Sequence, residues 1–468
     1  MHTTAGPVRS SVNPCAIEQG DHPLKRVRQL LAAVASLALT AALLALGVSP
    51  AAAASPKPPT SAPGIEYTAK PGDGAQRSSN GKGTAEMPIA PDNPAGTEWL
   101  NDCLGSSDAQ DPDGRVYNRF KWCQEYEFKN RYYKKVDGKP VLKGTNTIKF
   151  QAAAIGYNDT RATRVFFRAK TGQASYDGWN PVEKRTVAPN LKLEITPECV
   201  PGANQPTTAT CGVGRSPAMM EWAQWSNFPD WVYWDVSSNG GEGQDQVAFH
   251  QWRFYMNGAS PGYEQGTERG EGPPIGIRCD SADYFAHGVK RYPNACIYTG
   301  ALPFLTYDGN HPNIRQHIRD AQNAPATDGV TYPKENHPKK VPGKWSPTAG
   351  SRGAPLHRVV SRGQGGAIAL ANEEVKKAAC GQKSGSNPWG PDYNAATGLP
   401  PYNTSVDDCD EYPFSSTYEG ASSIEWDFSV RNIENGENRS AGTKLSNFYV
   451  DDRILAWPVE DPYWVNVD

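Results

Sequence analysis

Residues 231–236 read WVYWDV, a dense run of aromatic and β-branched residues that favours a strand. Three further segments alternate in a strand-like way: 147–152 (TIKFQA), 164–168 (RVFFR) and 191–195 (LKLEI). Glycine, asparagine and proline separate such segments at short spacing, as they do in the turns between antiparallel strands. The pattern predicts a mostly β, β-sandwich-like accessory domain over about residues 96–300.

The composition of the chain excludes several classes of protein. With 468 residues, a mean hydropathy of −0.63 and 21% charged residues, the chain has room for two or three domains and is not a polytopic membrane protein. Aromatic residues make up 10% of the chain, enough bulky apolar surface to disfavour complete disorder. The formal net charge of −3 gives no overall sign of a polyanionic partner, so any nucleic-acid signal must be local.

The N-terminal segment has the features of a secretory signal. Basic residues at 25–28 precede an uncharged run over 30–48, and the small residues SPAAAA follow at 49–54. This order predicts a signal peptide over residues 1–54 and a secreted, extracellular protein with no membrane attachment after cleavage. The alternative is an uncleaved anchor, because the run is just long enough to span a bilayer. Residues 55–95, rich in proline, glycine, serine and threonine, are expected to be a disordered linker.

Removal of the signal peptide deletes Cys15 and leaves an even number of cysteines. These are Cys103, Cys123, Cys199, Cys211, Cys279, Cys296, Cys380 and Cys409. An even count in an exported chain indicates disulfides. The simplest connectivity joins neighbours in the sequence, namely 103–123, 199–211, 279–296 and 380–409. A zinc–thiolate site is the alternative, but the sequence contains no C-x-x-C motif.

The pattern changes to mixed helices and strands after about residue 300. Apolar residues at helical spacing predict a helix over 314–322, with Asn313 as its N-cap, and a second helix over 366–379. Strand-like alternation returns at 424–430 and at 453–457. The C-terminal part is therefore expected to be an α+β domain.

Charges of opposite sign gather in two stretches of this C-terminal part. Residues 331–385 contain ten Lys or Arg against three acids, and residues 405–437 contain nine acids against one Arg. Phosphodiester hydrolysis needs both kinds of group, because cations hold phosphates and carboxylates hold a divalent metal ion. The alternative is that both stretches are solvated surface.

The acidic stretch contains the segment DCDEYP at 408–413. Three carboxylates within four residues repel one another unless a cation neutralises them. A disulfide from Cys409 to Cys380 would hold the segment rigid, and rigid carboxylates suit a general base and the ligands of a metal-bound water. Asp410 and Glu411 are therefore candidate catalytic residues, although an acidic turn would have the same composition.

Further candidates follow in the segments YEGA at 418–421 and ENRSAG at 437–442. An amide oxygen such as that of Asn438 can bind a hard cation, and the guanidinium of Arg439 can hold a phosphate through two hydrogen bonds. The alternative is that Asn438 only caps a helix.

Asn447 is a second candidate oxygen ligand, and a helix is expected to begin near Ser440. A helix turns about 100° per residue, so nine positions place Asn438 and Asn447 on opposite faces. The two can share a metal ion only if Asn438 lies in the loop before the helix.

The ordered set of these segments resembles the NucA/NucB family of small secreted bacterial deoxyribonucleases. The family's Asp-Arg-Asp-Glu-Trp-Pro is similar to the segment 408–413, with Cys409 in place of the Arg. Its Glu-Gly-Gly is similar to 419–421, with Ala421 in place of the second Gly. Its Asp-Asn-Arg-Gly-Ala-Gly-Ser is similar to 437–443, where a Glu replaces the Asp.

Two upstream elements extend the resemblance to about residues 310–468. The family's helix with His-Ile-x-x-Ala is similar to residues 317–321, and its Leu-His-Arg is similar to residues 356–358. The resemblance implies a nuclease domain over 301–468 with a ββα-metal type core, in which two strands and a helix hold one divalent ion. It covers about a third of the chain and implies nothing about the sandwich.

The resemblance and the charge pattern together imply a division of roles. The catalytic residues are expected to be Asp410 as general base, or Glu411 in its place, with Glu419 and Arg439. The ligands of a divalent Mg²⁺ or Mn²⁺ are expected among Asn438, Asn447 and Glu437. Sequence-independent contacts to DNA are expected from Lys339, Lys340, Arg352, His357 and Arg358.

Two other functions are consistent with the sequence. The chain could be a secreted carbohydrate- or cell-wall-binding protein with a structural acidic C-terminal domain, in which tryptophans at 222, 225, 231 and 234 stack on sugars. It could also be a nuclease toxin, which would need an immunity protein. In the main prediction DNA is the substrate, and no stable protein partner is expected.

His250 has no evident partner and is expected to be structural. A serine hydrolase is excluded because there is no G-x-S-x-G motif.

Overall fold

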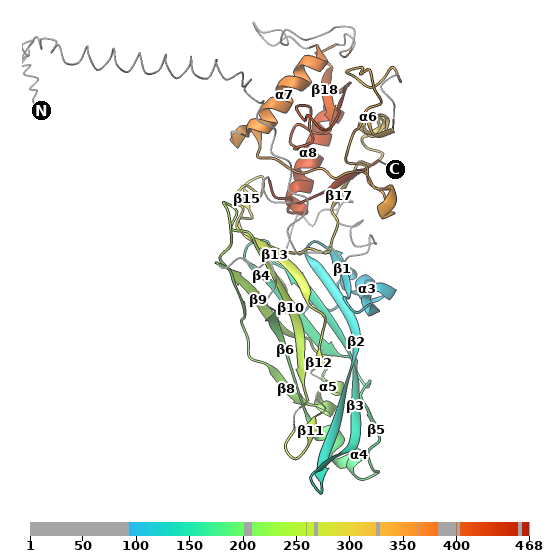
Figure 1. Cartoon of the computed structure of the whole chain (residues 1–468), viewed down its shortest axis with the longest axis vertical. Coiled ribbons are helices and arrows are strands. Elements are labelled where there is room, and N and C mark those ends of the chain that lie inside the picture. Colours follow the sequence, from blue (N-terminus) through green and yellow to red (C-terminus); the bar gives the residue numbers. More distant parts are fainter. Residues whose placement is uncertain are drawn as a thin grey trace, which may run out of the picture. The chain divides into compact units, whose positions relative to one another are not determined.

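The computed structural model describes residues 93–200, 208–258, 260–265, 270–323, 328–364, 366–381, 399, 403–456 and 461–467. The expected signal peptide and almost all of the expected linker lie outside these residues. Within the described part, the chain before Phe304 is mostly strands with a few short helices, and longer helices alternate with short strands from Phe304 onward (Figure 1). We refer to these as the sandwich and the C-terminal region.

The sandwich consists of two antiparallel sheets. The first has the order β1-β2-β3-β4-β9-β7, with β5 and β11 beside it: β1 (Arg115–Asn118), β2 (Lys121–Val136), β3 (Lys139–Gly156), β4 (Ala162–Ala169), β5 (Ser175–Asp177), β7 (Thr210–Val213), β9 (Val232–Asn239) and β11 (Glu264–Gln265). The second has the order β16-β13-β10-β6-β8, with β12 beside β10: β6 (Lys192–Val200), β8 (Ala218–Glu221), β10 (Ala248–Asn257), β12 (Gly270–Glu271), β13 (Ile275–Asp280) and β16 (Ala295–Tyr298).

Short elements complete the sandwich: α3 (Glu98–Leu104), α4 (Glu183–Thr186), α5 (Trp222–Asn227), β14 (Ala286–His287) and β15 (Lys290–Arg291). Long strands of both sheets run side by side in Figure 1. The four segments whose alternation predicts strands lie in β3, β4, β6 and β9, which agrees with a mostly β fold.

Aromatic side chains from both sheets fill the core between them. Phe150 and Phe167 come from the first sheet, and Trp252 and Phe254 come from the second. Along β10, every second residue is buried, because successive side chains of a strand point to opposite faces. The rings of Phe167 and Phe254 meet across the two sheets with centroids 5.0 Å apart. This shared core is what makes the two sheets a sandwich.

The tryptophans at 222–234 belong to this core or to the layer beside it. Trp222, Trp225 and Trp234 are fully buried, and Trp231 exposes 7% of its surface. The indole of Trp225 donates a hydrogen bond to the carbonyl of Leu193. Their ring faces are therefore not available for stacking on a sugar, which removes the main observation behind a carbohydrate-binding function.

Four disulfides lie in the described part of the chain, and they join the cysteines that are neighbours in the sequence. They are Cys103–Cys123, Cys199–Cys211, Cys279–Cys296 and Cys380–Cys409. The first ties α3 to β2, the second ties the two sheets together through β6 and β7, and the third joins directly opposed residues of β13 and β16. The cysteines are thus used in disulfides, and the zinc–thiolate alternative is wrong.

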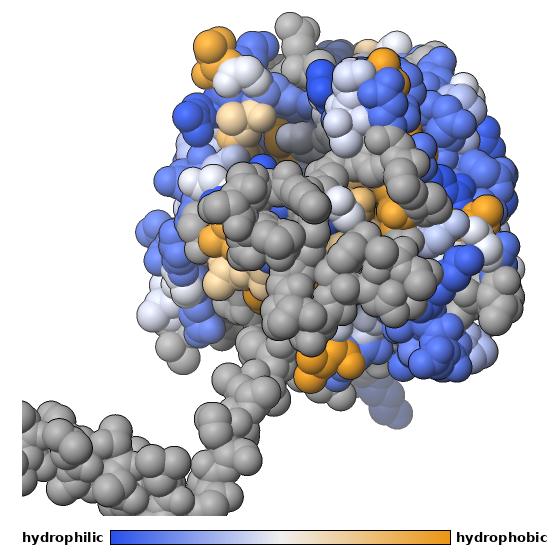
Figure 2. Space-filling model, turned by 90° about the horizontal axis from the view of Figure 1, so that it is seen from above, coloured by the Kyte–Doolittle hydropathy of each residue, from blue (hydrophilic) through white to orange (hydrophobic). Residues whose placement is uncertain are grey.

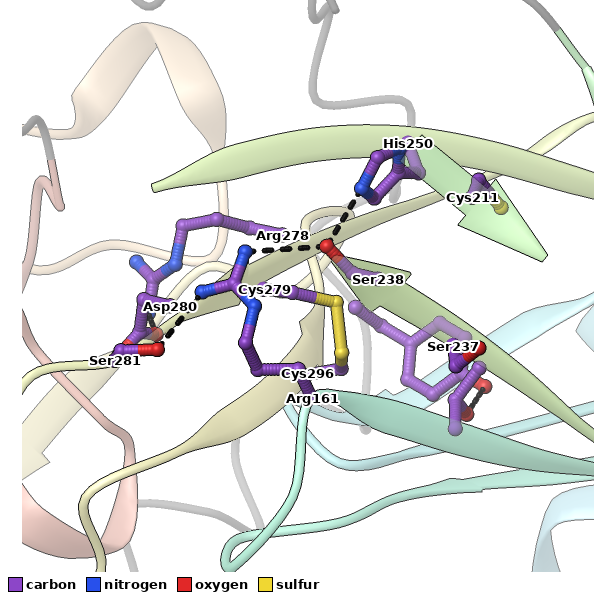
Figure 3. Close-up of a disulfide and its surroundings, with 12 residues drawn as sticks. Arg161, Cys211, Ser237, Ser238, His250, Arg278, Cys279, Asp280, Ser281 and Cys296 are labelled. Atoms are coloured by element: carbon purple, nitrogen blue, oxygen red, sulfur yellow. Dashed lines mark hydrogen bonds and ion pairs between the residues drawn. A yellow bond between two sulfur atoms is a disulfide. The ribbon is translucent and has the colours of Figure 1, made fainter. Parts of the chain in front are cut away.

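Figure 3 shows the polar groups around the Cys279–Cys296 disulfide. Arg161 donates hydrogen bonds to the hydroxyls of Ser238 and Ser281. The Nε2 atom of His250 lies 2.7 Å from the same Ser238 hydroxyl. Burial lowers the pKa of His250 to about 4, so the imidazole is neutral near pH 7. Ser238 is the partner for His250 that the sequence did not reveal.

The C-terminal region begins and ends with a pair of parallel strands. Its elements are β17 (Phe304–Thr306), α6 (Pro312–Asn323), α7 (Ala367–Cys380), β18 (Asp407–Tyr412), β19 (Ser429–Glu434), α8 (Asn435–Asp451) and β20 (Trp464–Asn466). β18 and β19 form an antiparallel pair, and α8 follows β19 without a break. Apolar residues of α6, β18 and α8, among them Ile318, Tyr412 and Phe448, share one core.

Several expected boundaries in this region differ from the structure. α6 begins at Pro312, so Asn313 lies inside the helix and is not its N-cap. Proline is favoured at the first position of a helix, because the N–H that it lacks would have no partner within the helix there. α8 begins at Asn435, five residues before Ser440. Only the end of the segment 424–430 belongs to a strand, because β19 starts at Ser429.

The segment 453–457 is not a strand in its described part, although it alternates. Its backbone amides have other partners: that of Leu455 donates to Asp461, and that of Ala456 donates to the hydroxyl of Tyr284. Side chains and not a neighbouring strand therefore satisfy this buried backbone, and the alternation that predicts a strand reflects burial alone.

Buried charges join the sandwich to the C-terminal region. The guanidinium of Arg453, which follows α8, donates several hydrogen bonds to the carboxylate of Asp280 on β13. Arg278 and Arg119 both pair with Asp461. All five side chains are at most 4% exposed. The two regions are thus joined by buried ion pairs, and removing one partner of such a pair is costly.

Hydrophilic residues predominate among the described residues on the face drawn in Figure 2, and hydrophobic ones stand in small groups. Such a distribution is ordinary for a surface in contact with water. Within the described part of the chain, no helix has the length and apolarity that crossing a membrane requires.

Candidate active site

A cavity of about 360 Å³ lies where β18, α7, α8 and the start of α6 meet. The residues that line it are Tyr307, Ile314, Arg362, Glu373, Lys376, Cys409, Asp410, Glu411, Phe414, Ser415, Ser416, Asn438, Arg439, Ala441, Gly442 and Leu445. Four of the predicted site residues are therefore neighbours of one cavity: Asp410, Glu411, Asn438 and Arg439.

The strand that carries the two carboxylates is held on both sides. On one side, Asp410 lies opposite Arg431 in the antiparallel pair of β18 with β19. On the other side, the disulfide from Cys409 ties β18 to Cys380, the last residue of α7. The helix ends there with Gly381 in the left-handed conformation (φ +64°), which glycine adopts without strain. The acidic segment is thus a fixed strand and not a flexible turn.

A buried histidine holds the carboxylate of Asp410. The Nδ1 atom of His317, on α6, lies 2.6 Å from Oδ2 of Asp410. Its Nε2 atom lies 3.0 Å from the hydroxyl of Ser429, on β19. The imidazole is fully buried, whereas 13% of the Asp410 side chain is exposed. The other carboxylate oxygen, Oδ1, has no hydrogen-bond partner among the described residues.

His317 is a residue that site prediction from the sequence missed. It was part of a helical pattern with Ile314, Ile318 and Ala321, which are all buried. A histidine on the apolar face of a helix needs polar partners once it is buried. That mismatch between residue type and position and the family's His-Ile-x-x-Ala motif were the available signals, but neither identifies the partner of His317.

Glu411 belongs to a network of alternating charges. The ammonium of Lys376 lies 3.3 Å from Glu411 and 2.8 Å from Glu373, and Arg362 pairs with Glu373 at 3.4 Å. The backbone N–H of Ser415 donates to the other oxygen of Glu411. Burial raises the pKa of Glu411, and the nearby Lys376 opposes this shift. Both oxygens of Glu411 thus already have partners.

The first turn of α8 contributes the amide of Asn438 and the guanidinium of Arg439. Within the described part of the chain, no hydrogen bond engages the side-chain amide of Asn438. Arg439 pairs with Asp408 at 3.2 Å, and 70% of its side chain is exposed. An exposed ion pair is weak, so Arg439 is able to leave Asp408 for an anion in the cavity.

Two of the predicted metal ligands lie away from this cavity. The carboxylate of Glu437 accepts hydrogen bonds from the backbone N–H groups of Asn313 and Ile314, at 2.7 and 3.0 Å. It therefore caps the N-terminus of α6, where a negative charge is favourable. Asn447 is exposed and does not line the cavity, because Asn438 lies inside α8 and nine helical positions separate the two residues.

Glu419 and His357 form a second buried pair, and neither lines the cavity. Glu419 is 1% exposed and accepts hydrogen bonds from the backbone N–H of His357, at 2.8 Å, and from its Nδ1, at 2.7 Å. The next residue, Gly420, leaves no room for a side chain, because an added Cβ would lie 2.3 Å from the amide nitrogen of Asn372. Ala421 is not among the described residues with positive φ, so it replaces a glycine there without strain.

The predicted DNA-binding cations have local partners outside the cavity. The ammonium of Lys339 donates to the carbonyl of Phe428, and burial lowers its pKa to about 8. The ammonium of Lys340 lies 4.5 Å from the ring centre of Trp426.

The two arginines of that set are also engaged. The guanidinium of Arg352 lies 4.5 Å from the ring centre of Trp345. Arg358 donates to the carbonyl of Ile454 and lies over the ring of Tyr284 in the sandwich. Burial lowers its pKa. The basic residues that do line the cavity are Arg362, Lys376 and Arg439.

The donor set of the cavity suits a hard divalent cation. Asp410, Glu411 and Asn438 present oxygen atoms, which Mg²⁺ and Mn²⁺ prefer, and Mg²⁺ is usually held by one or two carboxylates together with water. No group of three or more His, Cys, Asp or Glu side chains is placed for a metal ion in the described part of the chain. An all-protein cage of the zinc type is therefore absent there, whereas a water-rich magnesium-type site fits.

Comparison with known proteins identifies the C-terminal region. Residues 360–456 match the family model described as Deoxyribonuclease NucA/NucB. No curated protein and no solved structure matches the chain. The matched residues include all cavity-lining side chains except Tyr307 and Ile314. The family resemblance is thus confirmed over these residues, and the match supports a hydrolase that acts on DNA.

Proposed function

We propose that the protein is a secreted endonuclease that needs a divalent metal ion and hydrolyses phosphodiester bonds of DNA largely without sequence preference. The observation that carries this proposal is the convergence of Asp410, Glu411 and Asn438 on one cavity, together with three cations, inside the residues that match the deoxyribonuclease family. The order β18-β19-α8, two antiparallel strands followed by a helix, supports a ββα-metal type core.

Asn438 and one of the two carboxylates would hold Mg²⁺ or Mn²⁺. When bound, the ion neutralises the charge that develops on the phosphate and on the leaving oxygen. Asn438 suits this role because its amide is free of hydrogen bonds among the described residues. Its place in the first turn of α8 also sets it on a rigid element.

Asp410 is the better candidate for the general base. Both oxygens of Glu411 are engaged, by Lys376 and by the backbone N–H of Ser415. Asp410 has one oxygen held by His317 and one, Oδ1, without a partner in the described part of the chain. Oδ1 can therefore accept a proton from the attacking water, which is the task of a general base.

The cations around the cavity would hold the substrate. Arg439 and Arg362 are 70% and 59% exposed and make only weak ion pairs, so both can turn to a phosphate. Contacts of this kind position a DNA backbone without reading its sequence. Lys376 is less free, because it neutralises Glu411 and Glu373.

Export is supported by the signal-like N-terminus and by the four disulfides, which persist in oxidising compartments. We therefore place the activity outside the cell, with extracellular DNA as its substrate.

The proposal is tested by digestion of plasmid DNA with the purified chain, in Mg²⁺ or Mn²⁺ and with EDTA. Asp410→Asn is expected to lower the rate at least 100-fold, since general-base catalysis contributes about 10²–10⁴-fold. Asp407→Asn, on the same strand but outside the cavity, is the matched control and is expected to keep the rate. Digestion that survives both EDTA and Asp410→Asn would contradict the proposal.

A further inference from the structure

His317 lies outside residues 360–456, which match the family model, and belongs to the upstream helix whose His-Ile-x-x-Ala resembles the family; it contacts the carboxylate of Asp410 that lines the cavity. It comes from α6, about 90 positions before Asp410 in the sequence. Residues of α6 pack against α8, against β18, which lines the cavity, and against its partner strand β19. The fold thus brings a third segment of the chain behind the candidate general base.

The hydrogen bonds of His317 define how its protons are arranged. A neutral imidazole donates through one ring nitrogen and accepts through the other. Ionised Asp410 only accepts, so Nδ1 must carry the proton that bonds to Oδ2. Nε2 is then the acceptor, and the hydroxyl of Ser429 supplies the proton. We assign this tautomer from the network, since hydrogen positions follow from the partners.

We infer that His317 is a positioning residue of the nuclease reaction, which holds Asp410 through Oδ2 so that Oδ1 faces the cavity. This inference rests on the proposed function. Ser429 acts one step further out by selecting the tautomer of His317 that can donate to Asp410.

The surroundings of His317 distinguish this role from simple packing. Its helical neighbours Ile314, Ile318 and Ala321 are buried apolar residues, and an apolar side chain at 317 would continue that face. Instead, both imidazole nitrogens bond to polar partners, Asp410 and Ser429, and Asp410 lines the cavity. A carboxylate with a single fixed oxygen keeps one orientation, and a displacement of about 1 Å at a reacting group can lower a rate about 100-fold.

Two amide substitutions separate the two contacts of the imidazole. In His317→Asn the amide nitrogen takes the place of Nδ1, so it can still donate to Asp410. In His317→Gln the amide reaches the place of Nε2, so it meets Ser429 and leaves Asp410 unheld. Both variants bury one uncharged amide, so similar losses of thermal stability are expected. The two variants therefore differ in which contact of the imidazole is kept: Asp410 in His317→Asn and Ser429 in His317→Gln.

The experiment measures kcat and KM for plasmid DNA with the full chain in Mg²⁺, alongside thermal unfolding of each variant. His317→Gln is expected to lower kcat by roughly 10- to 100-fold with little change in KM. His317→Asn is expected to retain most of kcat. In an Asp410→Asn background, His317→Gln is expected to add no further loss, because its effect passes through that carboxylate.

Three outcomes would overturn the inference. One is an equal loss of kcat in the two variants, another is a change in KM alone, and the third is a further loss in the Asp410→Asn background. A wild-type chain that leaves DNA intact would overturn the proposed function and this inference with it. An active wild type with equal variants would overturn only the inference.

Discussion

The sandwich fills its core with aromatic rings, whereas the C-terminal region also buries pairs of ionisable side chains, one of them beside its cavity. In the sandwich, rings such as Phe167 and Phe254 meet across the two sheets. In the C-terminal region, His317 pairs with Asp410 and Glu419 pairs with His357. Burying ionisable groups costs free energy unless they are paired, and such groups cluster at functional sites. The difference indicates a scaffold in one region and chemistry in the other.

The junction between the regions is an exception to this contrast, because its charges are buried in the sandwich as well. Arg278 and Asp280 belong to β13, yet their partners Asp461 and Arg453 follow α8. The chain therefore uses buried charges both at its cavity and at the place where its two regions meet.

The largest effect is expected from breaking the junction. Asp280→Asn removes the charge that neutralises Arg453, and an uncompensated buried charge costs about 3–5 kcal/mol. The free energy of unfolding from urea titration of the full chain measures this loss. Asp137→Asn is the control, because Asp137 is exposed in a turn with φ +52°, a conformation that Asn tolerates. Equal stabilities of the two variants would show that the junction does not couple the regions.

The same pair predicts a dependence on pH. Burial alone would raise the pKa of Asp280, but Arg453 and Arg278 outweigh it and hold the pKa below its usual value. A carboxyl with a lowered pKa stabilises the fold above its unfolded pKa of about 4, and this stability is lost as the pH falls through the folded value. Unfolding free energies of the wild type should therefore decline below about pH 4, and less steeply in Asp280→Asn.

The next effect compares one disulfide of the sandwich with the disulfide of the C-terminal region. Replacing either Cys380 and Cys409 or Cys199 and Cys211 by alanine is expected to cost roughly 2–4 kcal/mol. The first pair should also lower nuclease activity below the melting temperature, because it holds β18 against α7. The second pair should leave activity intact where the protein is folded. The measurement is the nuclease activity of the two double variants at equal fractions of folded protein. Equal activities would mean that the cavity does not depend on the Cys380–Cys409 disulfide.

The smallest effect separates cations at the cavity from cations elsewhere. Arg362→Gln is expected to raise KM a few-fold and to reduce the slope of log affinity against log salt by about one. Lys340→Gln is the matched control, since Lys340 is exposed in the same basic stretch but lies over Trp426. Affinities for a DNA duplex at several salt concentrations measure both slopes. A larger change with Lys340→Gln would move the DNA-binding surface away from the cavity.

Local patterns in the sequence were sufficient for much of the fold. Alternation of apolar residues predicts strands because it depends only on the pleat of the backbone, and it located β3, β4, β6 and β9. It was misleading at 453–457, where the described residues of an alternating segment are buried but do not join a sheet, and two of their backbone amides donate to Asp461 and Tyr284. Alternation reports burial, and burial does not always mean a strand.

The candidate site was predictable to the extent that it lies in one stretch of chain. Asp410 and Glu411 stood out because adjacent carboxylates must share a neutralising group, and Asn438 stood out because its motif resembles that of a known family. The partners of these residues could not be predicted, because they come from other segments. His317 lies on α6, and Lys376 lies on α7.

By itself, the sequence was enough to predict the disulfide pairing, the strand-rich first part and the acidic segment at 408–411, because these depend on residue type and on spacing along the chain. Only the tertiary structure decided which oxygens and which cations share the cavity. Glu437, a predicted metal ligand, caps α6, and Arg358, a predicted DNA contact, lies over a ring of the sandwich. The physical reason is that hydrogen bonds and ion pairs act over a few ångströms in space, and distances along the chain do not determine distances in space.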